Sequence, residues 1–355
     1  MEAMTLRQAG LINQCPSLPS YQESREHNIV LPVSVYKAPS KEEPTAEYQQ
    51  RLPFIESNTK EISLTDLKEQ CIVPVFSKDN ELTISHQAFI ESVYEAVSQV
   101  FPSERILDPI VRVSHPIKGR IPEAIHKPAS ALLESDKTVF YERMMFCIDI
   151  PTIHRDIAGN QLVLQVGGVR AYNEQNLGTR KSAEKFKLFI GFKNMVCCNL
   201  CVSSDGYVSN LKAMEAGGLV QSAIRLFHDY SAEAHLKEME SYLNYEMSES
   251  LFAQFLGKCR LYQYLPSAEK KSLPLLQLTD TQISLVAKNY YEDPDFCKKP
   301  DDRFVSMWNV YNLFTGANKS SYIDNFLDRA QNAGELASGL CKALRGDEEY
   351  SWFLS

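Results

Sequence analysis

The segment Lys185–Tyr207 alternates apolar and polar side chains along its first half. A period of two residues is typical of a β-strand with one buried face, because successive side chains point to opposite sides of a sheet. The apolar positions are Phe186, Leu188, Ile190 and Phe192, and the lysines opposite them are Lys185, Lys187 and Lys193. The segment therefore predicts a β-hairpin or a pair of strands in the core.

The same segment contains Cys197, Cys198 and Cys201, the last two in a C-x-x-C arrangement. If residues 196–202 are also a strand, Cys198 and Cys201 point to opposite faces. Cys197 and Cys201 then share a face but lie about 13 Å apart, at about 3.3 Å per residue. Neither pair could chelate a metal ion or form a disulfide. We expect three reduced, mostly buried, metal-free thiols, and we predict no cofactor.

Length and composition indicate a globular chain. A length of 355 residues suggests two domains, or one large domain with an extended arm, and 44% hydrophobic content supports a sizeable core. No apolar run approaches the about 20 residues of a membrane span. The start of the chain lacks the basic and apolar regions of a signal peptide, and its nine cysteines are typical of reduced thiols. We therefore predict a cytoplasmic protein with no membrane partner.

The sequence pattern divides the chain into three regions. Residues 1–53 hold six of the 17 prolines and few periodic apolar positions, which predicts a loose arm or linker. Residues 54–209 are β-rich, with a short strand at Cys71–Phe76 and one early helix capped by Ser85. Residues 210–355 are mainly helical, either as a separate domain or as one domain with 54–209.

Strand patterns dominate Ile110–Tyr207, and no helix-length segment separates the last few strands. Strands that follow one another so closely pair in an antiparallel sheet. Gly167 and Gly168, inside one of these strands, indicate a bulge or a close approach of two backbones. The predicted fold class is α+β, with a largely antiparallel central sheet, a helical C-terminal half packed on it, and a loose N-terminal arm.

Capping residues mark the ends of the C-terminal helices. Thr279 and Gln282 fit a capping box ahead of an apolar run. A helix over residues 303–314 is predicted to stop at Gly316, and the last long helix is predicted to start with Ser321 as its cap.

Charge is unevenly distributed along the chain. Arg105–Lys193 holds 14 basic and 9 acidic residues, a net charge of +5, whereas the whole chain carries −8, which leaves −13 for the remainder. Such asymmetry can mark a polyanion site, although solvated strand faces give the same pattern.

Seven residues in or beside strands of this basic block are candidate contacts to nucleic acid. They are Arg112, Lys118, Arg120, Arg170, Tyr172, Arg180 and Lys181. Lys118 and Arg120 fall in the most cationic loop, residues 114–127, which either binds phosphates or is a connection with solvated charges. Arg170 and Tyr172 either bind a phosphate and stack on a base or simply end a strand.

His115, His154 and Asp156 are the candidates for acid–base chemistry. A histidine near a carboxylate can act as a general acid or base, or bind a metal. No residue in the pattern supplies a nucleophile or a second metal ligand, and a surface turn explains His154 and Asp156 equally well. We therefore rank an enzyme below the other functions.

Four stretches of the chain carry a family resemblance. They are SHPIKGR at 114–120, GVRAYN at 168–173, FIGFKN at 189–194 and WNVYNLFTGANKSS at 308–321. Together they resemble the domain-of-unknown-function family 3871 over about residues 55 to 355. That family has no established activity, so the resemblance implies no catalytic residue. The Cys-Asn-Leu and Tyr-Asn-x-x-Thr elements are also faintly similar to phage/plasmid-like proteins, which implies bacterial mobile elements as the setting.

Three functions are consistent with these patterns. The first is an accessory protein of a bacterial mobile element that binds single-stranded DNA or RNA through the basic sheet region. The second is a protein–protein interaction module, for example an inhibitor of a host defence whose acidic surplus mimics a nucleic acid. The third is an enzyme of unknown class.

Overall fold

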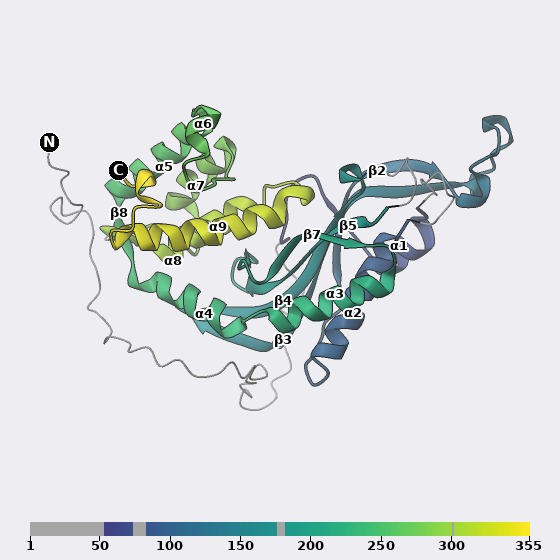
Figure 1. Cartoon of the computed structure of the whole chain (residues 1–355), viewed down its shortest axis with the longest axis horizontal. Coiled ribbons are helices and arrows are strands. Elements are labelled where there is room, and N and C mark those ends of the chain that lie inside the picture. Colours follow the sequence, from purple (N-terminus) through teal and green to yellow (C-terminus); the bar gives the residue numbers. More distant parts are fainter. Residues whose placement is uncertain (1–52, 74–82, 176–181, 300–301) are drawn as a thin grey trace.

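A computed structural model describes residues 53–73, 83–175, 182–299 and 302–355. These ranges contain a curled antiparallel sheet and a helical C-terminal part, which confirms the predicted α+β class (Figure 1). The predicted N-terminal arm lies outside the described residues except for Pro53, and so do Arg180 and Lys181.

The main sheet of the described residues is built from seven strands. They are β1 (Lys60–Ile62), β2 (Ile110–Arg120), β3 (Lys137–Ile157), β4 (Asn160–Ala171), β5 (Glu184–Asn194), β6 (Leu200–Cys201) and β7 (Tyr207–Ala213). Strands β1 to β5 pair in sequence order, and β5 then pairs with β6 at one end and β7 at the other, always antiparallel. The hairpin predicted within Lys185–Tyr207 is thus β5–β6, but residues 195–199 form its turn rather than a continuous strand.

Helices surround the sheet and form most of the C-terminal half. They are α1 (Leu64–Gln70), α2 (His86–Val100), α3 (Ala216–Asp229), α4 (Ala232–Ser241), α5 (Glu249–Tyr264), α6 (Ser267–Lys270), α7 (Asp280–Glu292), α8 (Met307–Asn318) and α9 (Ile323–Leu344). A small ribbon of β8 (Glu246–Ser248) and β9 (Phe304–Ser306) leads into α5 and α8. Ser85 caps α2, and Thr279 with Gln282 forms the capping box of α7, as predicted.

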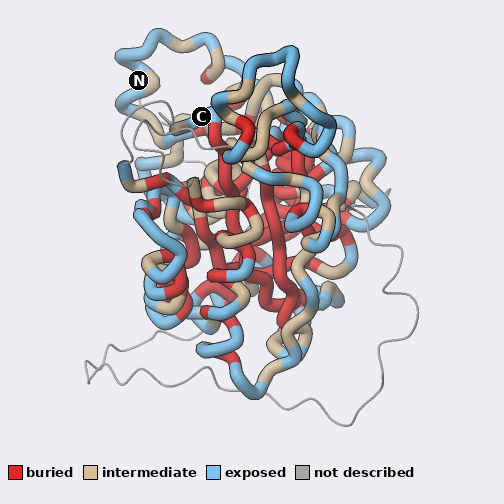
Figure 2. The backbone as a smooth tube through the Cα atoms, turned by 90° about the vertical axis from the view of Figure 1, so that its right-hand side faces the viewer, coloured by how far each residue is buried: buried red, intermediate tan, exposed pale blue. Residues whose placement is uncertain are grey.

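Both faces of the sheet are covered by helices. Helices α2 and α3 pack on one face and α9 packs on the other (Figure 1). The alternating apolar residues of β5, such as Phe186, point to the α2 side and join the main hydrophobic cluster. A smaller cluster beneath α9 includes Met145, Phe189 and Phe326. Because both faces are covered, β4 is buried at every position from 162 to 171. The buried residues of the described chain gather in the middle of the molecule (Figure 2).

Two local predictions in the β-rich region are corrected. The described part of the predicted strand, Cys71–Val73, is irregular, and the rest of that segment lies outside the described residues. The cationic segment 114–127 is not one loop, because β2 continues to Arg120 while paired with β3. The two strands form a ribbon that extends past the rest of the sheet (Figure 1).

Two helix boundaries also differ from the prediction. Helix α8 runs through Gly316 to Asn318, because tertiary packing outweighs the modest cost of a glycine within a helix. Helix α9 begins after Tyr322, whose side chain makes no capping hydrogen bond. Ser321 instead donates a hydrogen bond to the Asn318 side chain at 2.7 Å, within the connection between the two helices.

The paired glycines of β4 allow a close approach rather than a bulge. The register of β3 and β4 is continuous at Gly167 and Gly168 and shifts only between Ile150 and His154. A Cβ atom at Gly167 would lie 2.1 Å from the carbonyl oxygen of Phe146. Only a residue without a side chain fits there.

We predict that Gly167→Ala lowers the free energy of unfolding by about 1–3 kcal/mol, because the methyl group overlaps backbone that cannot move away. Gly257→Ala is the control: it lies on the exposed side of α5 with no atom within 4 Å of an added Cβ. That change should stabilise the protein by up to about 1 kcal/mol through helix propensity. Urea denaturation measures both; a Gly167→Ala protein as stable as the parent would contradict the prediction.

Candidate nucleic-acid interface and buried polar groups

Basic side chains cross the sheet on the face that carries α9. Arg143 of β3 and Lys187 of β5 both reach the start of that helix. Arg143 Nη1 lies 3.4 Å from Asp324 Oδ1, and Lys187 Nζ lies 2.9 Å from Asp328 Oδ2. These two cations are therefore neutralised by carboxylates of α9.

Arg112, a predicted contact residue, lies on the same face, but its guanidinium is bound by other residues of the protein. It is opposite Met145, which packs beneath α9. Its Nε donates to Thr59 Oγ1 at 2.9 Å, and its Nη1 lies 3.7 Å from Glu61 Oε2. These contacts tie the guanidinium to the residues before and within β1.

Two lysines continue this basic face at the edge of the sheet. Lys185 of β5 lies directly opposite Lys212 of β7, and both are exposed. Within the described ranges, neither ammonium group has an ion pair or hydrogen bond. Directly opposed like charges weaken strand pairing by a fraction of a kcal/mol, so an anion bound between them would be favourable.

Tyr322 lies beside the basic face. Its side chain is 52% exposed, and it comes two residues before Asp324, whose carbonyl oxygen accepts a hydrogen bond from Lys187. An exposed aromatic ring and exposed lysines are the kinds of group with which proteins bind single strands. Sequence analysis placed Lys185 on a strand face but missed Lys212 and Tyr322, because strand pairing and helix packing bring them there.

Arg170 and Tyr172 lie inside the protein instead of on its surface. Arg170 is 0% exposed and forms an ion pair with Glu184. Its guanidinium lies 4.3 Å from the ring centroid of Phe186 and 4.7 Å from that of Tyr172. Tyr172 is itself buried and stacks on His86. Neither residue can reach a phosphate or a base in the folded chain, which removes both from the interface.

Lys118 and Arg120 lie on the projecting ribbon. Lys118 is exposed opposite Val139, whereas Arg120 Nη1 donates to the Lys127 carbonyl oxygen at 2.6 Å. Ser114 of β2 pairs with Arg143 of β3. Lys118 lies four residues further along β2, about 13 Å from Ser114. The ribbon and the Lys185–Lys212 pair are therefore separate surfaces.

The three candidate acid–base residues are not brought together. His115 is on β2 next to Ser114, to whose hydroxyl its Nδ1 is hydrogen-bonded at 2.9 Å. His154 and Asp156 lie near the far end of β3. Arg143, beside the residues that face His115, pairs with Ala171, and His154 pairs with Val163, eight residues or about 26 Å away along β4. They do not form one site with His115.

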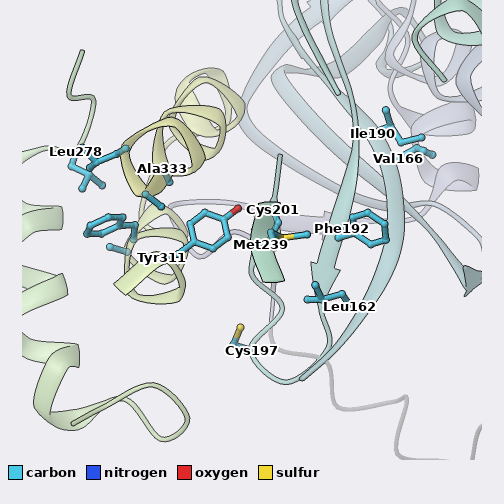
Figure 3. Packing of buried hydrophobic residues seen from close by; sticks show 14 of the residues in the cluster. Leu162, Val166, Ile190, Phe192, Cys197, Cys201, Met239, Leu278, Tyr311 and Ala333 are labelled. Carbon is cyan, nitrogen blue, oxygen red and sulfur yellow. The ribbon is translucent and has the colours of Figure 1, made fainter. Parts of the chain in front are cut away.

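The cysteines Cys197 and Cys198 of the β5–β6 turn and Cys201 of β6 are buried free thiols, as predicted. Cys197 and Cys201 lie among the buried hydrophobic residues of the main cluster (Figure 3). Burial raises the pKa of Cys197 and of Cys201 to about 12. Both thiols are therefore protonated near neutral pH and lack the thiolate needed for nucleophilic attack.

Lys319 and Asn312 hold this turn against the helical half. The buried Lys319 ammonium donates to the Cys197 carbonyl oxygen, and Asn199 Nδ2 donates to the Asn312 carbonyl oxygen at 2.9 Å. Cys198, at φ 57°, takes the left-handed conformation that the tight turn requires. Several residues of the family-like stretches thus join two parts of the fold.

The described residues offer no group of three or more His, Cys, Asp or Glu side chains arranged to hold a metal ion. Nor does any helix among them combine the length and apolar character needed to cross a bilayer.

Fold and site together define an α+β protein with a curled antiparallel sheet enclosed by helices and a basic sheet edge. Residues 38–354 match the family described as "Domain of unknown function, B. Theta Gene description (DUF3871)", and the chain belongs to this family. Comparisons with curated proteins and with solved structures give no significant match. The expected similarity to phage/plasmid-like proteins receives no support.

We predict that Arg170→Met costs about 3–5 kcal/mol of stability, because it leaves the Glu184 carboxylate buried without its cation. The double variant with Glu184→Gln should recover most of that loss. Arg260→Met is the control, since its pair with Asp280 is exposed and should be worth less than about 1 kcal/mol. Denaturation curves that give equal losses for Arg170→Met and Arg260→Met would contradict this account.

Two buried histidines predict a loss of stability in mild acid. Burial lowers the pKa of His86 to about 3 and that of His235 to about 4, below the ordinary 6.5. The unfolded chain therefore binds more protons below pH 6.5, and stability falls as pH drops from 6.5 towards 4. Each histidine contributes about 1.4 kcal/mol per pH unit.

Equilibrium unfolding at several pH values measures this dependence. The slope to be measured is that of the free energy of unfolding against pH. His86→Gln should reduce this slope between pH 6 and 4.5 by the contribution of one histidine, whatever its effect on absolute stability. A variant whose slope equals that of the parent would show that His86 does not resist protonation.

Proposed function

We propose that the protein binds single-stranded nucleic acid, weakly and with little sequence preference, at the surface formed by Lys185, Lys212 and Tyr322. The opposed Lys185–Lys212 pair, exposed and without a carboxylate partner among the described residues, carries the proposal. Phosphates placed between the two ammonium groups would relieve their repulsion and release condensed counterions. The Tyr322 ring would stack on a base, which is tolerant of sequence.

The surroundings predict a weak interaction. Asp324 and Asp328 lie at the start of α9 beside this surface and neutralise Arg143 and Lys187. The whole chain carries a formal charge of −8, which repels polyanions at long range. The accessory role in a bacterial mobile element was expected from the faint similarity to phage/plasmid-like proteins, which receives no support, and it is not part of the proposal.

Anisotropy of a labelled 20-nucleotide oligo(dT), titrated over a series of salt concentrations, tests the proposal. Replacing Lys185 and Lys212 by Ala should make the plot of log K against log salt shallower by about 1.4, because two phosphate contacts are lost. Tyr322→Ala should instead cost about 1–3 kcal/mol and leave the slope unchanged, because stacking releases no ions.

Two matched pairs serve as controls. Lys271→Ala with Lys288→Ala removes two exposed charges from the helical half and should leave the slope unchanged. Lys118→Ala with Arg120→Ala tests the ribbon; a loss of slope there, and not at Lys185 and Lys212, would place the interface on the ribbon. Absence of binding at low salt would overturn the proposal and favour a protein partner.

A further inference from the structure

A mainly apolar cavity of about 470 Å³ lies between α1, the start of α2, strand β3 and the start of α3. This volume falls within the range of small-molecule sites. Apolar side chains on its lining include Leu67 of α1, Ile72 after α1, Ile84 before α2 and Met214 after β7. The described lining contains no residue of the surface proposed for nucleic acid.

The mouth of the cavity is apolar and faces water. Ile72 is 40% exposed and Met214 is 50% exposed, whereas Leu67 and Ile84 of the same lining are buried. Large apolar side chains in contact with water gain free energy when an apolar molecule covers them. A cavity whose apolar lining continues from a buried wall to an exposed mouth therefore favours an apolar occupant.

The charged residues of the described lining balance each other. Lys68 and Glu215 line the cavity, both are exposed, and together they carry a formal charge of zero. An ion would lose its hydration in the apolar interior without a buried partner of opposite charge, whereas a neutral molecule avoids this cost. The occupant that fits best is therefore uncharged.

His86 supplies a hydrogen-bond acceptor without a partner. The residue lines the cavity, is 2% exposed and stacks on Tyr172. Its Nε2 donates to the Tyr141 carbonyl oxygen at 2.7 Å, because a carbonyl oxygen can only accept. Burial lowers the pKa of His86 to about 3, so the ring is neutral and Nδ1 is left as an acceptor.

This Nδ1 atom is buried and has no hydrogen-bond partner among the described residues. Buried polar atoms are nearly always hydrogen-bonded, so an orphan on the lining of a cavity points to a donor on a bound molecule. A hydroxyl or an N–H group meets this requirement, and a carboxylate or an ether does not.

We propose that this cavity binds a neutral, mainly apolar small molecule that carries one hydroxyl or N–H donor. Its apolar body would lie against Leu67, Ile72 and Met214, and its donor would bond to His86 Nδ1. The proposal concerns different residues from the nucleic-acid interface, so either can fail without the other.

Isothermal titration of the full chain with 2-naphthol, and with naphthalene and 2-naphthoate, tests the proposal. Naphthalene has the same rings but no donor, and it should bind about 10-fold more weakly because His86 Nδ1 stays unsatisfied. The anion 2-naphthoate should also bind more weakly than 2-naphthol. No measurable heat with 2-naphthol at millimolar concentration, or equal affinity for any two of the three compounds that include 2-naphthol, would overturn the proposal.

Variants of the wall and of the mouth separate the two contacts. His86→Phe keeps a ring that can stack on Tyr172 but removes the acceptor, and it should abolish the preference for 2-naphthol over naphthalene. Met214→Ser changes an exposed residue at the mouth and should weaken 2-naphthol binding about 3- to 10-fold through lost apolar contact, even if the His86 variant fails to fold.

Leu275→Ser is the matched control, since this leucine is 57% exposed and lies in the connection between α6 and α7, away from the cavity. It should leave 2-naphthol affinity unchanged. An equal loss in Leu275→Ser and Met214→Ser would show that 2-naphthol adheres to exposed apolar side chains generally and would overturn the proposal.

Discussion

Enclosure of β4 on both faces is the constraint on which the rest of the structure depends. A strand buried from residue 162 to 171 leaves no water for its polar side chains or for those of its neighbours. Each must find a partner inside the protein, because an isolated buried charge costs several kcal/mol. Arg170 pairs with Glu184, and Lys193 pairs with Asp149 at 2.9 Å, on opposite faces of the sheet. Cations that would otherwise be surface contacts are thereby used to hold strands together.

The connection between the sheet and the helical half follows the same rule. The β5–β6 turn exposes backbone carbonyls and amide side chains towards α8, where Lys319 and Asn312 satisfy them. Asn194 also donates to the Asn312 side chain at 3.2 Å. The stretches FIGFKN and WNVYNLFTGANKSS that carry the family resemblance meet here. In this chain the residues of both stretches join the sheet to the helical half, which is a structural role.

The surfaces with unsatisfied charge lie away from this joint. Lys185 and Lys212 are at the sheet edge, where β7 has one neighbour and side chains remain in water. The cavity beside α2 is lined by buried and by exposed residues. His86 is buried, whereas Ile72 and Met214 are exposed. Burial of its wall leaves a neutral hydrogen-bond acceptor, and its mouth keeps apolar side chains in water.

The sequence by itself determined the local order of this protein. The period of two along β5, the capping residues of α2 and α7, and the short connections between strands follow from backbone geometry and nearest neighbours. It could not determine what covers a strand, because burial depends on helices more than a hundred residues away. The position of α9 decided that Arg143 and Lys187 are neutralised and Lys185 is not. Packing of α2 decided that Arg170 and Tyr172 are core residues, and the meeting of α1, α2 and α3 decided where a cavity exists.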